Sequence, residues 1–480
     1  MTAQGRHGTF ASGPLLLRDA ALFTDLYELT MAASYFGEGM DGSATFSLFV
    51  RKLPEARPFL IAAGLEDTLN YLASFRFSRE AIGYLRSLGH FEGDFLDFLR
   101  TLRFTGEVQA VREGTAVFGD EPLLEITAPI IEAQIVETAV LNFCHFQTLL
   151  ASKAARSVIA ARGRPVVDFG LRRTHGIDAG MKAARCAFIA GATMSSNVLA
   201  GQHYGIRPTG TMAHSYVTAF PREIDAFRAF ARAFPANTIL LIDSYDTVAA
   251  AHKAVEMARE MEARGQRLAG VRLDSGDIVT LSKEVRRVLD AAGLDYVRIF
   301  VSGGLDEDYV DAFLKEGAPI DAFGVGTRMD VSADVPYLDM AYKLVAYEGR
   351  NVLKISTGKT TWAGQKQVYR FRERDGRFRG DLLTLRDEPP PVAKAEPLLR
   401  TVMTSGRIVE PHPPLTAVRD YCTAQVAAVP EGLRRLKNAG TYSVAYSHRL
   451  VSLQRSLEAQ VGATEVVPVR REPLRRGEDR

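Results

Sequence analysis

Two short stretches place acidic side chains directly after apolar runs of strand-like composition. The first, "LIDSYD", carries Asp243, and the second, "VRLDSGD", carries Arg272, Asp274 and Asp277. Carboxylates are hard oxygen ligands that suit Mg²⁺, and a guanidinium fork suits phosphate or carboxylate. Together the two stretches indicate a site for Mg²⁺ and a polyphosphate. Either stretch alone could equally be a turn in which the aspartate only caps the backbone.

Two further stretches, "FVSGGLDE" and "FGVGTR", end an apolar run with glycine and a small hydroxyl residue. Glycine lets backbone amides approach a ligand closely, and the N-terminus of a following helix favours an anion. Each stretch alone is a common strand-to-helix turn, but the pair predicts a phosphate-binding site. Its residues are Ser302, Gly303, Gly304, Gly324, Gly326 and Thr327.

The stretch "VVDFGLRRTHG" adds Phe169, Arg172, Arg173 and His175 at another strand end. An aromatic ring beside arginines can hold a flat anionic ring, which stacks on the aromatic and pairs with the cation. The alternative is a core phenylalanine followed by solvated arginines. The residues by themselves leave both interpretations open.

His214 follows Gly210 and Thr211 in "RPTGTMAHSYV" and precedes a helix-like run. Such a histidine can be structural, a general base, a metal ligand or a phosphate acceptor. No histidine or cysteine partner stands at metal-ligand spacing, which argues against zinc.

These residues require strands that end at a common edge. Short apolar runs alternate with helical patterns, and Asp243, Asp274, Ser302 and Gly324 follow one another at intervals of 31, 28 and 22 residues, the length of a strand-helix unit. A parallel α/β sheet is therefore predicted. Its strands are expected in "PVVDFG", "CAFIAGA", "TILLIDSYDT", "LAGVRLDSGD", "VRIFVSGG" and "IDAFGVGT".

An open doubly wound sheet and a closed barrel compete for these strands. A dinucleotide-binding sheet carries Gly-x-Gly-x-x-Gly in its first turn, whereas here the nearest match, "FGVGTRM", comes late and lacks the third glycine. Glycine-rich turns after the last strands suit the phosphate-binding loops of a barrel. We predict an irregular α/β barrel.

The ends of the chain have a different character. "TDLYELTMAASYF" is helical by its apolar spacing, while "SATFSLFVRKL" and "GEVQAVREGTAVFGDEPLLEITAPI" resemble strands. Further strands are expected in "YKLVAYEG", "NVLKIST" and "QKQVYRFR", which would return to this α+β module. The expected organisation is a disordered start (1–18), an N-terminal module (19–150), a barrel (151–335), C-terminal segments that complete the module (336–465) and a disordered basic tail (466–480).

The composition excludes several classes of protein. The 480 residues are 46% hydrophobic and carry a net charge of only +2, so neither nucleic acid nor an acidic membrane is an expected partner. Three widely spaced cysteines do not make a disulfide framework or a zinc site. Without a signal-like N-terminus or an apolar run of about 18 residues, the protein is expected in the cytoplasm.

Eight motifs, taken in order, resemble those of nicotinate phosphoribosyltransferase, a type II phosphoribosyltransferase. They are "TDLYELTM", "DFGLRRTHG", "PTGTMAHS", "LIDSYDT", "GVRLDSGD", "VSGGLDE", "FGVGT" and "YKLV". The resemblance implies an enzyme of NAD biosynthesis that joins nicotinate to 5-phosphoribosyl 1-pyrophosphate, releasing nicotinate mononucleotide and pyrophosphate. It further implies coupled ATP hydrolysis, Mg²⁺, and a homodimer with shared active sites.

The same resemblance implies roles for individual residues. His214 would be phosphorylated by ATP, and Asp243 and Asp274 would handle Mg²⁺, ribose and pyrophosphate. Phe169 and a partner subunit's Tyr27 would enclose the pyridine ring, with Arg172 nearby. Thr211 and Arg272 would bind its carboxylate, and the two glycine-rich turns would hold the 5-phosphate.

Two rival functions remain. Relatives that act on nicotinamide carry an acidic residue in the loop where this chain reads "ATMSSNVLAG", with Ser196 and Asn197. A carboxylate there would repel nicotinate, so its absence favours the acid over the amide. The other rival is a barrel that binds a phosphorylated ligand without catalysis, against which the complete set of chemical groups argues.

Overall fold

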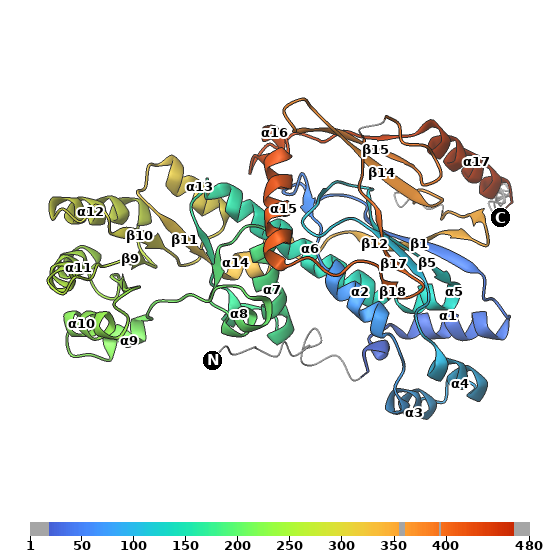
Figure 1. Ribbon diagram of the computed structural model, residues 1–480, viewed down its shortest axis with the longest axis horizontal. Coiled ribbons are helices and arrows are strands. Elements are labelled where there is room, and N and C mark those ends of the chain that lie inside the picture. Colours follow the sequence, from blue (N-terminus) through green and yellow to red (C-terminus); the bar gives the residue numbers. More distant parts are fainter. Residues whose placement is uncertain (1–18, 355–360, 393–394, 465–480) are drawn as a thin grey trace, which may run out of the picture.

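The computed structural model describes residues 19–354, 361–392 and 395–464. The predicted disordered ends, 1–18 and 466–480, lie outside the described residues, as does the second half of "NVLKIST". The chain forms two parts, a parallel sheet ringed by helices on the left of Figure 1 and a mixed module on the right. The class is mixed α/β with a parallel sheet, as the sequence predicts.

The parallel sheet has six strands in the order β7-β6-β11-β10-β9-β8. Except for β7 and β8, strands that follow one another along the chain lie side by side in this sheet, and β11 pairs with β6, so the order follows a ring. Between β7 and β8 no pairing is present among the described residues, and the ring stays open at that seam. The strands are β6 (Val166–Asp168), β7 (Met194–Ser195), β8 (Ile239–Leu241), β9 (Gly270–Leu273), β10 (Arg298–Val301) and β11 (Ala322–Val325).

One predicted strand is wrong. The run "CAFIAGA" ends a helix, α7 (Ile177–Ile189), and the second strand of the sheet is the two-residue β7 instead. From Gly180 to Ile189 every residue of α7 is buried, and the run from Cys186 to Ala192 contains no polar side chain that would mark it as part of a helix. A short apolar run that is buried on all sides reads the same as a strand.

Helices cover this sheet and begin at side-chain caps. Asp246, Asp277 and Asp306 each accept hydrogen bonds from backbone amides of the first helical turn that follows them. These caps fix where each strand-end loop stops. Besides α7, the helices are α8 (Val198–Tyr204), α9 (His214–Thr218), α10 (Glu223–Ala233), α11 (Thr247–Glu262), α12 (Ile278–Ala291), α13 (Glu307–Lys315) and α14 (Thr327–Asp330).

The module on the right contains a seven-stranded sheet in the order β13-β12-β1-β5-β3-β17-β18. Its three inner strands come from the first part of the chain and the other four from the last part, so both ends build one sheet. Its strands are β1 (Ser43–Val50), β3 (Glu107–Ala110), β5 (Pro122–Pro129), β12 (Met340–Tyr347), β13 (Arg350–Asn351), β17 (Arg400–Thr404) and β18 (Arg407–Ile408).

Two smaller sheets belong to the same part. One has the order β16-β14-β15-β19, and the other pairs β2 (Leu60–Ile61) with β4 (Ala116–Val117). Their remaining strands are β14 (Lys366–Arg372), β15 (Phe378–Leu385), β16 (Glu396–Pro397) and β19 (Val444–Tyr446). The helices are η1 (Ala20–Leu22), α1 (Leu26–Gly37), α2 (Leu65–Ser74), α3 (Arg79–Ser87), α4 (Gly93–Thr101), α5 (Ile130–Ile135), α6 (Glu137–Ala160), α15 (Leu415–Ala428), α16 (Glu431–Arg434) and α17 (His448–Thr464).

A buried network of charges joins the two parts. Asp334 accepts hydrogen bonds from Arg57 and pairs with Lys153 at 2.8 Å, and Lys153 also pairs with Glu307 at 2.7 Å. Burial opposes ionisation of Asp334, but Arg57 and Lys153 outweigh it and lower the pKa of this carboxyl to about 2. Because Glu307 begins α13, the network anchors the helix that follows the first glycine-rich turn.

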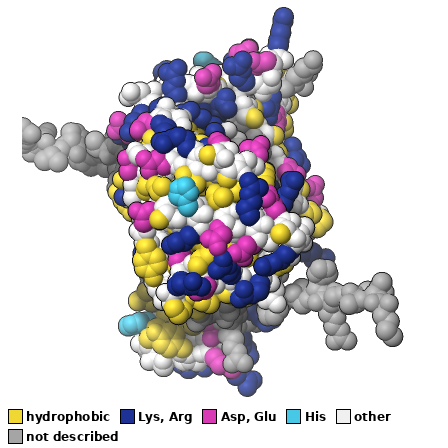
Figure 2. Space-filling model, turned by 90° about the vertical axis from the view of Figure 1, so that its left-hand side faces the viewer, with side chains coloured by type: hydrophobic (Ala, Val, Ile, Leu, Met, Phe, Trp, Pro, Cys, Tyr) yellow, Lys and Arg dark blue, Asp and Glu magenta, His cyan; other side chains and the backbone are white. Residues whose placement is uncertain are grey.

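The surface around α10, α11 and α12 mixes basic, acidic and apolar side chains (Figure 2). The three cysteines, Cys144, Cys186 and Cys422, are buried and unpaired. Among the described residues, no helix is both long and apolar enough to cross a membrane.

Candidate active site

Arg272 lies at the centre of the loops that follow the parallel strands. Its guanidinium group donates to Ser302 Oγ at 2.7 Å, to Thr211 Oγ1 at 3.0 Å and to Asp274 Oδ1 at 2.6 Å. A fourth bond reaches the carbonyl oxygen of Met212 at 3.2 Å. One planar cation therefore connects three loops, which only an arginine fork can do in this geometry.

Asp274 and Ser302 form a second link between neighbouring strands. Ser302 donates to the same Asp274 oxygen that Arg272 binds. Burial alone would raise the pKa of Asp274, but the hydrogen bonds from Ser302 and Arg272 outweigh it and hold that pKa below its ordinary value. Asp274 is thus a carboxylate at neutral pH, and 27% of its side chain faces solvent.

Asp243 and His214 face each other across the next loops. Asp243 Oδ2 accepts from the Asp274 amide at 2.9 Å and from Ser275 Oγ at 2.6 Å. The other oxygen, Oδ1, is buried, has no hydrogen-bond partner among the described residues and lies 4.0 Å from His214 Nε2. His214 Nδ1 lies 3.0 Å from Ser244 Oγ, and 44% of the histidine side chain is exposed. The unpaired oxygen therefore lies beside the ring of a half-exposed histidine.

Phe169 forms an apolar wall beside the arginine. The Arg272 guanidinium lies 5.5 Å from the centre of the Phe169 ring, which meets Phe300 edge-on at 5.6 Å. A Cβ atom on Gly324 would come within 2.7 Å of this ring, so glycine leaves the space that the ring occupies. An aromatic face next to a guanidinium group suits a flat, negatively charged ring.

The two glycine-rich turns lie at the ends of the neighbouring strands β10 and β11. Gly303 has a φ of +92°, and a Cβ atom there would lie 1.8 Å from the Asp274 carbonyl oxygen. Thr327 begins α14 directly after Gly326, and its hydroxyl accepts from Arg173 at 3.2 Å. Both turns thus place a glycine backbone beside a hydroxyl group, an arrangement typical of phosphate-binding turns.

The structure leaves three of the predicted residues outside this cluster. Asp277 uses both side-chain oxygens on Thr280, where it caps α12. Arg172, in the short helix η2 (Leu171–Arg173), is exposed. Tyr27 is 50% exposed on α1, at the opposite end of the molecule in Figure 1, so it does not meet the cluster within one chain.

The sequence alone did not identify two residues that contribute to the site. Ser275 holds the Asp243 carboxylate, and its place within the Asp-Ser-Gly turn was the available signal. Asp330 lies buried against Gly170, and no local pattern marks it. Only the folded chain brings Asp330 to the site.

Mg²⁺ fits these residues when a phosphate-bearing substrate completes its coordination. No group of three or more histidine, cysteine or acidic side chains able to hold a metal ion occurs in the part of the chain that the structure describes. However, Asp243 Oδ1 is a buried carboxylate oxygen without a donor, and Asp274 keeps its charge beside it. Mg²⁺ typically takes one or two protein carboxylates and fills the rest of its shell with water and substrate phosphates.

Strand-end loops that combine an arginine fork, two carboxylates, an accessible histidine and two glycine-rich turns define an α/β enzyme for phosphorylated substrates. Family models agree with this class and extend over most of the chain. The nicotinate phosphoribosyltransferase (NAPRTase) N-terminal domain matches residues 22–145, the NAPRTase family matches 165–374, and the C-terminal domain matches 392–454. The chain belongs to the nicotinate phosphoribosyltransferase family, which confirms the resemblance of its motifs.

Individual relatives cover nearly the whole chain. Nicotinate phosphoribosyltransferase pncB2 of Mycobacterium tuberculosis is 52% identical over 90% of this chain and 92% of its own length. The Bacillus subtilis nicotinate phosphoribosyltransferase is 36% identical over 89% of this chain and 93% of its own. The crystal structure of human nicotinic acid phosphoribosyltransferase superposes with a TM-score of 0.81 at 30% identity, covering 90% of this chain and 99% of that chain.

Proposed function

We propose that the protein transfers the phosphoribosyl group of 5-phosphoribosyl 1-pyrophosphate to nicotinate, forming nicotinate mononucleotide and pyrophosphate. The observation that carries the proposal is the Arg272 fork beside the Phe169 ring, linked through Asp274 and Ser302 to the glycine-rich turn after β10. This arrangement offers an aromatic face and a cation to a pyridine carboxylate, with phosphate-binding turns at the adjacent strands. Two relatives that are 52% and 36% identical are nicotinate phosphoribosyltransferases, which supports the same substrates.

The ring nitrogen of nicotinate would attack C1 of the ribose while the bond to pyrophosphate breaks. Because positive charge develops on the sugar, the protein has to align two reactants and neutralise the leaving group rather than provide a nucleophile. Phe169 and Arg272 would orient the pyridine ring and its carboxylate, with Thr211 and Arg172 beside them. Gly303, Gly326 and their neighbours in the two turns would hold the 5-phosphate through backbone amides.

Asp243 and Asp274 would bind Mg²⁺ together with the pyrophosphate group. When bound, Mg²⁺ supplies positive charge that stabilises the departing pyrophosphate. Asp277, which caps α12, would reach the metal only through bound water. The parallel sheet would act in this reaction as an irregular barrel that is open between β7 and β8.

ATP would be coupled to the reaction through His214. If Nδ1 donates to Ser244 Oγ, the lone pair of Nε2 is free, and that nitrogen faces Asp243 at the exposed side of the ring. Nε2 would attack the γ-phosphorus of ATP, the bond to the ADP oxygen would break, and water would later hydrolyse the phosphohistidine. A phosphate there adds about −1.5 to −2 charge beside the pyrophosphate site, enough to change substrate affinity.

The assembly would be a homodimer in which the partner subunit's Tyr27 covers the pyridine ring. Two exposed apolar side chains, Leu26 at 49% and Tyr27 at 50%, stand together at the start of α1, which favours a contact there. Large exposed apolar side chains that adjoin one another are common at subunit interfaces.

Nicotinate is favoured over nicotinamide by the loop after β7. Asn197 is buried, accepts from the Ala200 amide at 3.0 Å and donates to the Gly180 carbonyl at 3.1 Å, so its side chain is fully engaged. Neither Ser196 nor Asn197 supplies a carboxylate that would accept an amide N–H group or repel the carboxylate of nicotinate.

The test is to incubate the purified protein with Mg²⁺, 5-phosphoribosyl 1-pyrophosphate and either nicotinate or nicotinamide, with and without ATP, and to measure the mononucleotides by chromatography. We expect nicotinate mononucleotide, formed faster with ATP. Turnover of nicotinamide without any product from nicotinate would overturn the proposal.

The histidine has its own test, acid-labile labelling by ATP that carries a labelled γ-phosphate. His214→Ala should abolish the label and the coupled ATP hydrolysis while slow synthesis of the mononucleotide continues. His252→Ala, an exposed histidine on α11, is the matched control and should keep the label. A label that survives in His214→Ala would refute the phosphohistidine.

A further inference from the structure

A pair of buried carboxyl groups lies beneath the predicted pyridine-binding wall. Asp168 is the last residue of β6 and is 1% exposed, and Asp330 is the last residue of α14 and is 4% exposed. Their loops follow neighbouring strands, because β6 and β11 pair in parallel with Asp168 opposite Val325. The pair therefore lies between the turn that carries Phe169 and the turn that carries Thr327.

Asp168 has donors for both of its oxygens. Oδ1 accepts from the Gly170 amide at 3.0 Å, and Oδ2 accepts from Ser195 Oγ at 2.6 Å. Ser195 ends β7 and also accepts from the Asn197 amide at 3.0 Å, so this carboxylate organises the loops after β6 and β7 together. Two donated hydrogen bonds stabilise the ionised form of a buried carboxyl group.

Asp330 lacks such donors. Its Oδ2 is buried without any hydrogen-bond donor among the described residues. The cations of neighbouring elements are occupied elsewhere, because Arg173 donates to Thr327 and Lys153 of α6 pairs with Glu307 and Asp334. The pKa of Asp330 lies well above its ordinary value. Burial is the largest cause, and the charge of Asp168 and a hydrogen bond with Asp168 raise the pKa further.

Gly170 brings the backbone against Asp330. A Cβ atom at this position would lie 2.1 Å from Asp330 Oδ2, so only glycine allows the carboxyl group to reach the backbone of the turn. The residue before this glycine is Phe169, whose amide donates to the Val325 carbonyl at 2.8 Å. The Asp330 side chain thus supports the turn from which the Phe169 ring projects.

Two buried carboxyl groups that have no cation beside them in the described part of the chain cannot both be ionised, since the charge of each raises the energetic cost of ionising the other. One proton shared between them removes the repulsion and supplies a donor. Asp168 already accepts two hydrogen bonds as a carboxylate, so the proton belongs on Asp330, where it can donate to Asp168.

We propose that Asp330 is a positioning residue of the active site, and that its neutral carboxyl group donates a hydrogen bond to Asp168 and holds the turn after β11 against the turn that carries Phe169. Asp330 touches no substrate and acts through Phe169 and Thr327. The inference rests on the proposed function, because the consequence to be measured is substrate binding at that site.

Two substitutions of Asp330 distinguish a neutral carboxyl group from an ionised one. In Asp330→Asn the amide keeps the shape and still donates to Asp168, whereas Asp330→Ala removes the donor and leaves a cavity behind Gly170. We expect Asp330→Asn to stay within about threefold of wild type in KM for nicotinate. Asp330→Ala should raise that KM about 10- to 100-fold, with a smaller change in kcat, because the ring wall is displaced rather than lost. Asp290→Asn, an exposed carboxylate on α12, is the matched control.

Two results would contradict this role in catalysis. If Asp330→Asn is as impaired as Asp330→Ala, the ionised form of Asp330 is required and the shared proton is wrong. If Asp330→Ala keeps the wild-type KM while remaining folded by circular dichroism, the residue does not position the site.

An infrared measurement tests the proton directly and does not depend on activity. The wild-type spectrum minus the Asp330→Asn spectrum at neutral pH should contain the carbonyl band of a protonated carboxyl group. A difference that contains only carboxylate bands overturns the proposal. An inactive wild type that still shows the band would count against the proposed function while leaving the carboxyl pair intact.

Discussion

Replacing Arg272 with lysine keeps the positive charge and removes the planar fork. The native guanidinium group makes four hydrogen bonds, to Ser302, Thr211, Asp274 and the Met212 carbonyl. A lysine ammonium group concentrates its donors at one point and can keep about two of these bonds. We therefore expect Arg272→Lys to impair the alignment of the loops even though the net charge is unchanged.

The magnitude follows from the bonds that are lost. A hydrogen bond to a charged group contributes about 1.5–3 kcal/mol. Three of the four acceptors of Arg272 are neutral, so the lower part of this range applies and losing two bonds costs ~3–4 kcal/mol. At 1.36 kcal/mol for each factor of ten, kcat/KM for nicotinate should fall roughly 100- to 1,000-fold.

The assay is the steady-state rate of nicotinate mononucleotide formation at saturating 5-phosphoribosyl 1-pyrophosphate, with thermal unfolding measured in parallel. Arg267→Lys is the matched control, because Arg267 stacks on Tyr296 at 4.9 Å and both residues precede the N-terminal ends of their strands, β9 and β10, whereas the site lies at the C-terminal ends. If Arg272→Lys stays within about threefold of wild type, the fork does not organise the site and the reasoning fails.

Gly303→Ala should lower Tm and raise the KM for 5-phosphoribosyl 1-pyrophosphate about tenfold or more, because its φ is +92° and a Cβ atom would lie 1.8 Å from a carbonyl oxygen. Gly304→Ala, with a φ of +63° and nothing within 4 Å, should cost only about 1–2 kcal/mol of stability; equal effects would refute this contrast. Burial, and then the charge of Glu137, raise the pKa of Glu28 to about 7. The protonated Glu28 side chain therefore contributes fully to the stability of the folded protein below about pH 4, and this contribution is lost as the pH rises through 7. Denaturant unfolding should therefore find Glu28→Gln ~1–3 kcal/mol more stable than wild type near pH 8, and a gap that does not shrink in acid contradicts this. Asp277→Ala should lower the free energy of unfolding by about 1 kcal/mol through loss of the α12 cap, whereas a changed Mg²⁺ dependence of the rate would show that it binds the metal.

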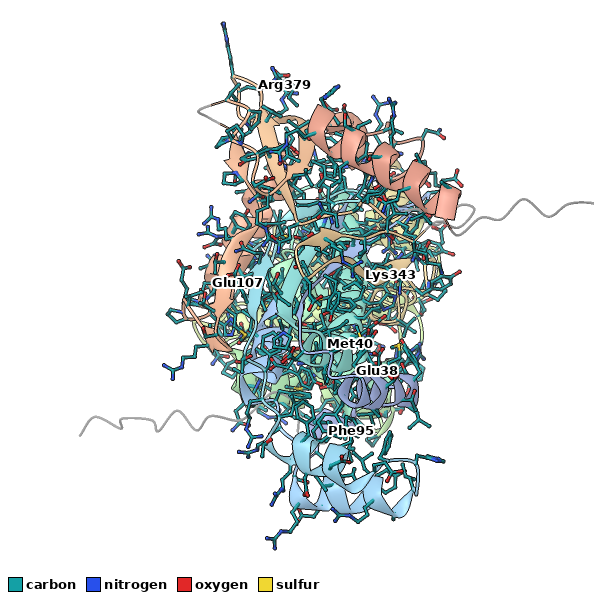
Figure 3. All side chains as sticks on the ribbon, turned by 90° about the vertical axis from the view of Figure 1, so that its right-hand side faces the viewer. Glu38, Met40, Phe95, Glu107, Lys343 and Arg379 are labelled. Carbon is teal, nitrogen blue, oxygen red and sulfur yellow. The ribbon has the colours of Figure 1, made fainter. Side chains whose placement is uncertain are left out.

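The Glu28 carboxyl group belongs to the module that Figure 3 views from the side, where Lys343 projects from β12 above Glu38 and Met40 at the end of α1. Glu28 accepts from Gln134 at 2.5 Å, and Glu137 pairs with both Gln134 and Lys343. Glu28 lies beside Tyr27 in the chain. We therefore expect protonation of Glu28 to affect the start of α1, the surface proposed to contact a partner subunit.

The local sequence was sufficient to predict the strands that have a strong apolar pattern. The strand ends in "LIDSYD", "VRLDSGD", "FVSGG" and "FGVGT" all coincide with β8 to β11, because each buried strand is a short apolar run bounded by turn residues. The same local rule failed for "CAFIAGA", since a fully buried stretch of helix has the same apolar sequence pattern as a buried strand.

The sequence by itself determined the family, the parallel α/β class and the chemical groups of the site, because residue types and their order along the chain carry that information. Only the tertiary structure decided which groups meet. It joined Arg272 to Thr211 across 61 positions, left Asp277 as a helix cap, and placed Asp330 behind Gly170. Such contacts depend on how strands and loops pack around one sheet, and no local pattern encodes the distance between two loops that are far apart in the chain.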